Sequence, residues 1–312
     1  MAFNLKGRSL LTLHQYSPEE IRFLLDLSHE LKGKRRSGEV TQLFRGKTLA
    51  LLFEKRSTRT RCAFETAFGE EGGHPVFLSS QDIQLGAKET IEDTARVLGR
   101  MFDAIQFRGF KQEMVEKLAE YSGVPVYNGL TDLYHPTQAL ADLMTVEEVF
   151  GSAKGVKVVF VGDGRNNVSR SLLIICSKIG VHYTVVAPAS LQPDKESLTR
   201  CGEYAAASGS RIFVTEDIVE GVRDADVVYT DVWVSMGEEE KSKERLDLLK
   251  PYQVNESLMA KSGKRETIFM HCLPAVKGNE VSFEVIEGPA SRVWEQAENR
   301  KHTIKALMVA TI

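Results

Sequence analysis

A dense group of basic and hydroxyl side chains occupies residues 53–65, with the sequence FEKRSTRTRCAFE. It follows the apolar run KTLALLF, which is typical of a buried strand, and it leads into apolar residues at helical spacing. The group therefore lies where a strand ends and a helix begins, with Ser57 placed to be the N-cap. Basic residues are unexpected there, because a helix N-terminus carries partial positive charge and favours acidic neighbours.

An anion bound at this helix start would account for the basic residues. Backbone N–H groups and the Arg59 guanidinium could donate hydrogen bonds to it. The hydroxyls of Ser57, Thr58 and Thr60 could donate as well. A dianionic phosphate fits best, because it offers several acceptor oxygens and enough charge to offset the cations.

The alternative interpretation of this segment is a solvated basic surface. In that case Lys55 and Arg61 would pair with carboxylates that are near in the sequence. The candidates are Glu54, Glu65 and Glu70.

Two further polar groups follow later strands in the same half of the chain. Arg108 directly follows the apolar run DAIQF, at the carboxyl edge of the same predicted sheet. In YHPTQALAD, Pro136 suits the first position of a helix, so His135 and Gln138 belong to its first turn. A lone histidine at a helix start is more often a cap, but three strand ends that deliver such groups together indicate a binding site.

The second half of the chain carries polar residues at comparable places. Asn166 and Asn167 in FVGDGRNNV stand where the strand VKVVFVG turns into a helix. Asp231 follows the strand DVVYT and therefore projects from a sheet edge, although a capping or surface role is equally compatible with its neighbours. Cys272 lies just past TIFMH, where a small thiol is more often a buried packing residue.

Short apolar strands that alternate with helices must position these groups, and this pattern favours parallel sheets covered on both faces. We expect two doubly wound α/β domains with the active site in the cleft between them. The stretch EVFGSAKGVK predicts the boundary, which gives domains at 1–147 and 148–289, and a C-terminal helix from about 290–312 that packs back onto the first domain. The predicted strands are KTLALLF, HPVFLS, DAIQFR and VPVYNG in the first half, and VKVVFVG, HYTVVA, RIFVT, DVVYTD and TIFMHC in the second.

Length and composition fit an ordinary soluble protein of two domains: 312 residues, 42% hydrophobic, with a net charge of −3. A nucleic-acid binder would show a clustered basic excess, and a membrane span would need an apolar run of roughly 20 residues. The N-terminus has no apolar signal core, so we expect a cytoplasmic protein. The four cysteines have no paired spacing, which predicts reduced thiols and no zinc site.

With these motifs the sequence resembles the aspartate and ornithine carbamoyltransferases. STRTR and HPTQ are similar to the family's carbamoyl-phosphate motifs, and the resemblance runs from GRSLLTLHQYSPEEI to AENRKHTIKALM. DVWVSMG (231–237) and HCLP (271–274) resemble the marks of the ornithine branch.

The resemblance implies that the side-chain amine of ornithine attacks the carbonyl carbon of carbamoyl phosphate, which gives citrulline and phosphate. This chemistry needs no metal and no organic cofactor. Arg300 would add a cation near the carbonyl oxygen; by its neighbours alone it would be an exposed arginine. The residues assigned to carbamoyl phosphate are Ser57, Thr58, Arg59 and Thr60 for the phosphate, and Arg108, His135, Gln138 and Arg300 for the carbamoyl group and bridging oxygen.

The resemblance also assigns the second substrate. Asn167 would bind the carboxylate and amine of ornithine, and Asp231 would accept from its α-ammonium group. Ser235 and Met236 lie on a polar, glycine-containing stretch that suits a mobile lid.

Cys272 would face the reacting amine, and the backbone carbonyls of Cys272 and Leu273 would accept from the carbamoyl NH₂ group. The thiol would position the amine or handle a proton. Direct attack by the amine leaves no role for a covalent intermediate.

In the family, a glutamine and a lysine after the second strand reach the neighbouring subunit's site. Gln84 and Lys88 occupy matching places, although Gln81 is a second candidate for the glutamine. The resemblance therefore implies a homotrimer, or a multiple of trimers, with shared active sites.

Rival functions have weaker support. A nicotinamide-dependent oxidoreductase would use GDGRNN, but Asn167 replaces the last glycine of the motif and the next strand ends without the expected acidic residue. A non-catalytic anion-binding protein would not need two substrate sites. Aspartate, putrescine and N-acetylornithine carbamoyltransferases are the rivals within the family, and both the biosynthetic and the arginine-breakdown direction remain open.

Overall fold

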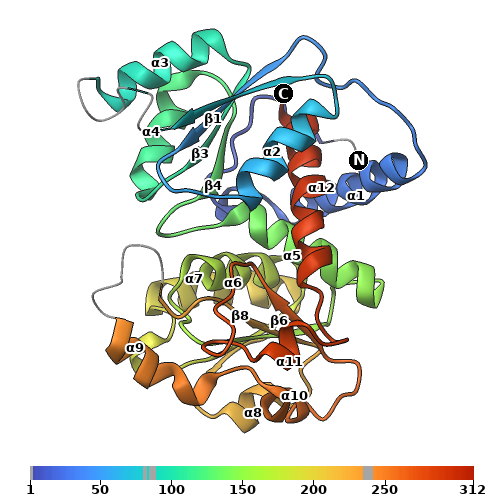
Figure 1. The fold of residues 1–312 in the computed structure, drawn as a ribbon, viewed down its shortest axis with the longest axis vertical. Coiled ribbons are helices and arrows are strands. Elements are labelled where there is room, and N and C mark those ends of the chain that lie inside the picture. Colours follow the sequence, from blue (N-terminus) through green and yellow to red (C-terminus); the bar gives the residue numbers. More distant parts are fainter. Residues whose placement is uncertain (1–2, 80–82, 84–88, 235–241) are drawn as a thin grey trace. The chain divides into compact units, whose positions relative to one another are not determined.

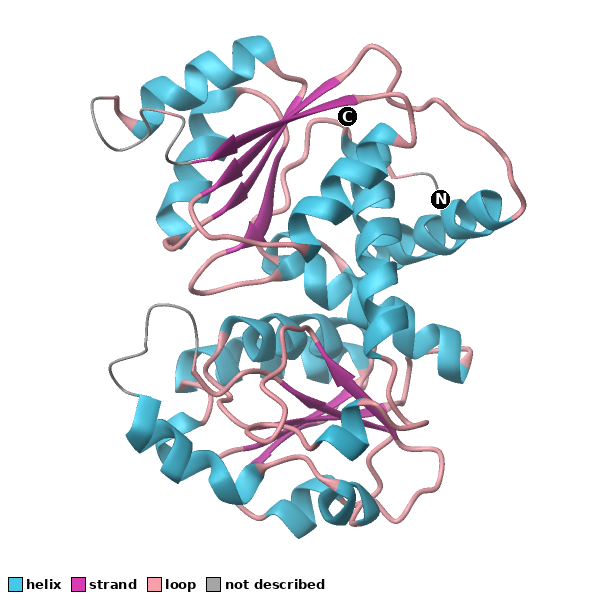
Figure 2. Ribbon diagram, in the orientation of Figure 1, coloured by secondary structure: helices cyan, strands magenta, loops and turns pink. Residues whose placement is uncertain are grey.

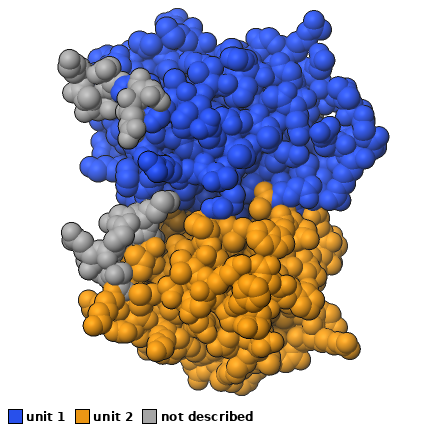
Figure 3. Space-filling model, in the orientation of Figure 1, with its two compact units in different colours: residues 1–144, 298–312 blue, residues 145–297 orange. Residues whose placement is uncertain are grey.

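The computed structural model describes residues 3–79, 83, 89–234 and 242–312. The chain forms two compact units, of residues 1–144 with 298–312 and of residues 145–297 (Figure 3). Both are parallel α/β units (Figures 1 and 2), which confirms the predicted fold class. None of the described helices is long and apolar enough to cross a membrane.

The first unit contains a four-stranded parallel sheet in the order β2-β1-β3-β4. β1 is an almost wholly apolar run, as expected for a central strand that helices cover on both faces, whereas β3 and β4 also carry buried polar residues. The last residue of β1, Phe53, is in register with Arg108 at the end of β3. The strands are β1 (Thr48–Phe53), β2 (His74–Ser79), β3 (Ala104–Arg108) and β4 (Val126–Leu130).

Helices cover both faces of this sheet. On one face, α3 and α4 pack through Leu98 and Leu118 against the buried side chains of Ile105 and Phe107. On the other face, the Tyr127 ring stacks on Phe64 of α2, and its hydroxyl bonds to Thr311 of α12 at 2.7 Å. The elements are the 3-10 helix η1 (Leu13–Gln15) and the helices α1 (Pro18–Arg36), α2 (Arg59–Gly69), α3 (Ile91–Met101), α4 (Gln112–Ser122), α5 (Pro136–Phe150) and α12 (Val293–Thr311).

Buried polar contacts hold the end of α12 against α1 and α2. Lys305 Nζ lies 3.0 Å from Glu70 and 2.8 Å from Glu71, at the end of α2. Lys32 of α1 donates to Asn299 at 2.6 Å. Since a buried charge is costly unless it is paired, these contacts set where α12 lies on the first unit.

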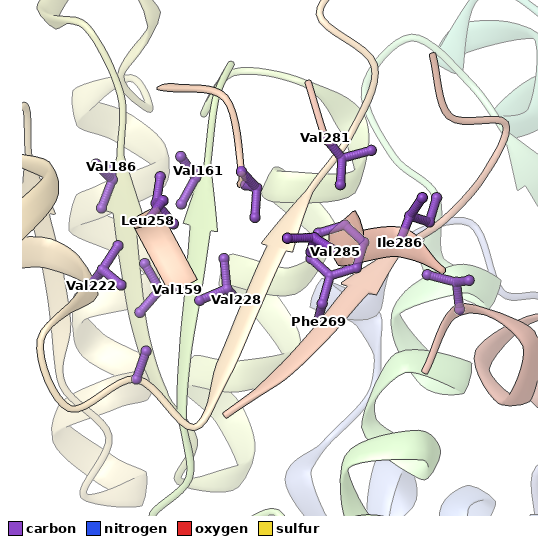
Figure 4. Packing of buried hydrophobic residues seen from close by; sticks show 13 residues of the cluster. Val159, Val161, Val186, Val222, Val228, Leu258, Phe269, Val281, Val285 and Ile286 are labelled. Carbon is purple, nitrogen blue, oxygen red and sulfur yellow. The ribbon is translucent and has the colours of Figure 1, made fainter. Parts of the chain in front are cut away.

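The second unit contains a five-stranded parallel sheet in the order β7-β6-β5-β8-β9. Figure 4 shows the core on one face, where Val159, Val228 and Phe269 of the sheet meet Val285 and Ile286 of α11. The strands are β5 (Lys157–Val161), β6 (His182–Val186), β7 (Ile212–Thr215), β8 (Val227–Thr230) and β9 (Ile268–His271). The helices are α6 (Asn167–Ile179), α7 (Lys195–Ser208), α8 (Ile218–Val222), α9 (Ser242–Leu249), α10 (Glu256–Ala260) and α11 (Phe283–Ile286), with 3-10 turns η2 (Ala189–Leu191) and η4 (Lys250–Tyr252).

Candidate active site

Each sheet has a point where the strand order reverses, and ligands of open α/β sheets bind beside the carboxyl ends of the strands there. In the first sheet this point lies between β1 and β3, and in the second it lies between β5 and β8. The segment 54–60 follows β1, and Arg108 ends β3. Asn166 follows β5 and Asp231 follows β8. The predicted polar groups therefore lie where this fold usually binds its ligands.

The start of α2 borders a pocket of about 340 Å³ whose lining includes Lys55, Ser57, Thr58 and Arg61. The Ser57 hydroxyl accepts from the backbone N–H of Thr60 at 3.1 Å, which is the bond of an N-cap. The regular helix begins at Arg59 with Thr58 as its flanking residue, one position after the predicted cap. Ser57 thus orders the first turn although it lies just outside the helix.

Arg61 pairs with a nearby carboxylate, as the alternative interpretation of a solvated basic surface predicts. Its guanidinium bonds to Glu65 at 3.0 Å and lies 3.7 Å from the centroid of the Phe77 ring. The ammonium of Lys55 lies over the Phe110 ring at 4.3 Å. The basic segment therefore divides into residues that pack on the surface and residues that face the buried cluster described next.

Thr60 is the centre of a buried polar cluster in the first unit. Its hydroxyl oxygen accepts from Arg108 Nη1 at 3.1 Å and from Arg300 Nη2 at 3.2 Å. Arg300 also donates to Gln138 Oε1 at 2.7 Å and to the Thr137 hydroxyl at 3.3 Å. Arg300 is buried, so the exposure expected from its neighbours in the sequence is wrong.

His135 stands at the same cluster, directly before Pro136, which is the first residue of α5 as predicted. Burial lowers the pKa of His135 well below its usual value, and the charges of Arg300, Arg108 and Arg59 lower it further. The imidazole is therefore neutral at physiological pH. It can donate one hydrogen bond to a carbonyl without adding a third positive charge beside the two buried arginines.

The second unit brings Asp231, Asn166 and Cys272 together. Asp231 Oδ2 accepts from Asn166 Nδ2 at 3.2 Å, and Oδ1 accepts from the Cys272 thiol at 3.0 Å. The backbone N–H of Val232 donates to the same Oδ1 at 2.8 Å. Burial raises the pKa of Asp231, while His271 and these donors act in the opposite direction. The donors therefore offset part of the cost of burying this carboxylate, which in its ionised form can accept from a cation.

The HCLP segment turns sharply after β9. Leu273 has a positive φ of 58°, and the peptide bond between Leu273 and Pro274 is cis. The backbone N–H of Leu273 donates to Nδ1 of the buried His271 at 2.8 Å. The backbone N–H of His271 in turn donates to Gln296 Oε1 at 3.0 Å. These contacts fix the backbone that carries the Cys272 and Leu273 carbonyls.

Comparison with known proteins assigns both units to one family. Residues 8–148 match "Aspartate/ornithine carbamoyltransferase, carbamoyl-P binding domain", and residues 154–311 match "Aspartate/ornithine carbamoyltransferase, Asp/Orn binding domain". The chain belongs to the aspartate/ornithine carbamoyltransferase family.

Similar relatives carry names of the ornithine branch. The chain is 67% identical to the ornithine carbamoyltransferase of Caldanaerobacter subterraneus over 312 residues, 100% of both chains. It is 54% identical to a Bacillus licheniformis protein named "Ornithine carbamoyltransferase, catabolic", over 99% of this chain and 97% of that one. The solved structure of ornithine carbamoyltransferase from Pyrococcus furiosus superposes with a TM-score of 0.96 at 48% identity, covering 99% of this chain and 98% of that one.

Two residues in these polar clusters were not assigned a role from the sequence. Asn166 bonds to Asp231. The sequence assigned ornithine binding to the neighbouring Asn167, the first residue of α6, and that assignment stays a prediction. Thr137 contacts Arg300, although it lies inside the HPTQ motif itself. A signal existed for Asn166, because its side chain also caps α6 through Ser169 N–H at 2.7 Å, the usual place for an asparagine.

Other predicted residues of the carbamoyltransferase site lie outside the described part of the chain. These are Gln81, Gln84, Lys88, Ser235 and Met236.

Asp231, His271 and Cys272 offer ligand atoms that all lie within 4.8 Å of one another, a set that could hold a metal ion. The sequence predicts no metal site. The Cys272 thiol donates to Asp231, and His271 Nδ1 accepts from the backbone N–H of Leu273, so each of these groups also has a hydrogen-bond partner within the protein.

Proposed function

We propose that the protein transfers the carbamoyl group of carbamoyl phosphate to the side-chain amine of L-ornithine, which gives L-citrulline and phosphate. One observation carries the choice of ornithine within the family. The second unit holds the buried Asp231 carboxylate, with donors on both oxygens, at the switch point of its sheet. A carboxylate there suits an α-ammonium group, whereas a site for aspartate would need cations for an extra carboxylate.

We assign the two substrates to the two domains predicted from the sequence. Residues 1–147 with the C-terminal helix would bind carbamoyl phosphate, and residues 148–289 would bind ornithine. Asn167 would bind the carboxylate of ornithine, and Ser235 and Met236 would cover it.

The first unit would hold the dianion and polarise the carbonyl. Ser57, Thr58, Arg59 and Thr60 would donate to the phosphate at the start of α2. Neutral His135 and the cations Arg108 and Arg300 would surround the carbamoyl oxygen, where negative charge develops as the amine attacks. Because the two arginines are buried and are held by hydrogen bonds to Thr60 and Gln138, they would need little reorganisation during the reaction.

The amine must be neutral to attack, and an alkylammonium group has a pKa near 10.4 in water. Positioning and stabilisation of the oxyanion would therefore supply most of the rate. The carbonyls of Cys272 and Leu273 would accept from the carbamoyl NH₂, and Gln138 would contact the same group. The reaction forms a C–N bond, breaks the C–O bond to phosphate and releases a proton from the amine, and it requires no metal or organic cofactor.

We further propose a cytoplasmic homotrimer that works in arginine biosynthesis, with Gln84 and Lys88 reaching the neighbouring subunit's site. Because one relative is named catabolic, the breakdown direction is the competing assignment. Rates of citrulline formation and of citrulline phosphorolysis, measured with the same preparation, would distinguish the two directions.

The function is tested by citrulline-type product formation from carbamoyl phosphate, with ornithine, putrescine, N-acetylornithine and aspartate at equal concentration. Ornithine should react fastest. Absence of product with every amine would contradict carbamoyl transfer, and a faster reaction with another amine would move the protein to that branch.

A further inference from the structure

α5 carries a buried carboxylate directly behind the cluster that holds Arg300. Gln138 and Asp142 are four residues apart, so they lie on the same face of the helix. Gln138 Nε2 donates to Asp142 Oδ1 at 2.8 Å, and Gln138 Oε1 accepts from Arg300 Nη1 at 2.7 Å. Asp142 and Gln138 are each 1% exposed, and Arg300 is 2% exposed. A carboxylate, an amide and a guanidinium therefore form one buried chain of hydrogen bonds.

The two ends of this chain leave the amide only one favourable orientation. A guanidinium has donors and no acceptor, whereas an ionised carboxylate has acceptors and no donor. An amide between them must turn its oxygen to Arg300 and its NH₂ group to Asp142. The opposite orientation would face donor with donor and acceptor with acceptor, and buried groups without a partner are costly.

The same carboxylate strengthens the acceptor to which Arg300 donates. Arg300 and Arg108 both donate to the Thr60 hydroxyl, and Arg300 also donates to the Thr137 hydroxyl and the Gln138 amide. Asp142 polarises the amide so that its oxygen is a stronger acceptor for the guanidinium, because hydrogen bonds in a chain strengthen one another.

We propose that Asp142 is a positioning residue, which fixes the Gln138 amide and through it holds Arg300 at the carbamoyl group. The inference rests on the proposed function, which places Arg300 beside the carbonyl oxygen. Asp142 itself touches no substrate. Loss of its charge gives the amide two orientations, and Arg300 then lacks its acceptor for part of the time.

The first test compares Asp142→Asn with Glu147→Gln, a matched control that also removes a buried carboxylate from α5. Asp142→Asn should lower kcat/KM for carbamoyl phosphate by about tenfold, a typical coupling between contacting residues. Glu147→Gln should stay within about twofold. Calorimetric affinity for inorganic phosphate should be unchanged in both, because phosphate probes only the start of α2. Equal kinetics for the two variants would overturn the proposal.

A second test exchanges the carboxylate and the amide between positions 142 and 138. It remains decisive if Asp142→Asn alone is poorly folded. In Gln138→Glu the introduced carboxylate faces Asp142, and two buried like charges repel. Adding Asp142→Asn to this variant lets the introduced amide donate to the introduced carboxylate, which still accepts from Arg300. Asp142→Asn should therefore lower activity in the native protein and raise it several-fold in Gln138→Glu. A loss in both backgrounds would show that Asp142 supports packing only.

Failure of the proposed function would give results different from failure of the positioning role of Asp142. In that case the unmodified protein would form no citrulline, or Arg300→Ala would be as active as the unmodified protein. The positioning role fails on its own when both of these controls behave as proposed and the sign of the Asp142→Asn effect does not reverse.

Discussion

The Cys272 thiol donates a hydrogen bond to Oδ1 of Asp231, with sulfur and oxygen 3.0 Å apart. A thiol that donates to a carboxylate keeps its proton, because a thiolate would repel the buried charge. A catalytic nucleophile needs the opposite environment, in which neighbouring cations or an adjacent base favour the thiolate. The contact therefore supports a positioning role for Cys272 and argues against a covalent intermediate.

Substitution of Cys272 should separate these roles. Cys272→Ser retains a donor to Asp231 and should keep most of the activity. Cys272→Ala removes it and should lower kcat/KM for ornithine by about three- to tenfold, the size of one hydrogen bond of about 0.5–1.5 kcal/mol. Steady-state kinetics with ornithine varied measure both effects. A loss of about four orders of magnitude in Cys272→Ala would instead indicate a nucleophile.

Arg59 and Arg61 test the anion site with a matched pair on one helix. Arg59→Ala should weaken carbamoyl-phosphate binding by about 1.5–3 kcal/mol, the scale of a charge-assisted hydrogen bond. Arg61→Ala removes the same charge, but Arg61 is already bonded to Glu65 and packed on Phe77, so its effect should be smaller. Calorimetry measures both affinities. Unchanged affinity in Arg59→Ala would refute its role at the phosphate.

Shared active sites predict complementation between two inactive variants. Lys88→Ala subunits keep an intact pocket, and Arg108→Ala subunits keep an intact loop. When the two are unfolded together and reassembled, about a quarter of the sites should combine both intact parts, as random pairing at a cyclic interface requires. Each variant reassembled alone is the control. Mixed oligomers without any gain in activity would exclude sharing through Lys88.

Local patterns in the sequence predicted the elements of the fold well. All nine predicted strands are present. Short apolar runs bounded by turn residues are a strong signal for buried strands in a chain that alternates strands and helices. The predicted helix HPTQ begins at Pro136, where the missing N–H of proline is no loss. The start of α2 differs by one residue, since the Ser57 cap and the first helical residue can be assigned differently from the same hydrogen bonds.

Contacts between distant residues could not be read from the sequence. Arg300 and Gln138 are 162 positions apart, and nothing near Arg300 in the sequence indicates its burial. The Arg61–Glu65 pair is local, and the pairing alternative did predict it. Asn166 and Asp231 are 65 positions apart, so their contact also depends on tertiary packing rather than on the motif.

His302 should make the stability of the protein depend on pH. Burial lowers the pKa of His302 from 6.5 to about 4, although the hydrogen bond to Glu298 and its charge act to raise this pKa. Between these values the unfolded chain binds a proton that the folded chain does not, so the free energy of unfolding should fall as the pH is lowered. His302→Gln should flatten this decline, whereas the exposed His74→Gln should not. Denaturant unfolding across this pH range measures the slopes, and identical slopes for His302→Gln and the unmodified protein would contradict the assignment.

Asp231 should determine which amine the protein accepts. Putrescine lacks the carboxylate of ornithine, and N-acetylornithine presents a neutral amide where Asp231 requires a cation. Leaving a desolvated polar or charged group without its partner costs about 1–3 kcal/mol. We therefore expect a preference for ornithine of at least about tenfold in kcat/KM, at about 1.4 kcal/mol per decade.

Asp231→Asn should lose much of this preference by weakening ornithine binding, while carbamoyl-phosphate binding stays nearly intact because the phosphate and most of the proposed donors to the carbamoyl group belong to the first unit. Because burial raises the pKa of Asp231, ornithine binding to the unmodified protein should also weaken as the pH falls through that raised pKa, since the protonated acid no longer attracts the ammonium group. Asp231→Asn should lose this pH dependence. Kinetics with each amine over a range of pH measure both effects, and a variant that keeps the native preference and pH profile would place the recognition of ornithine elsewhere.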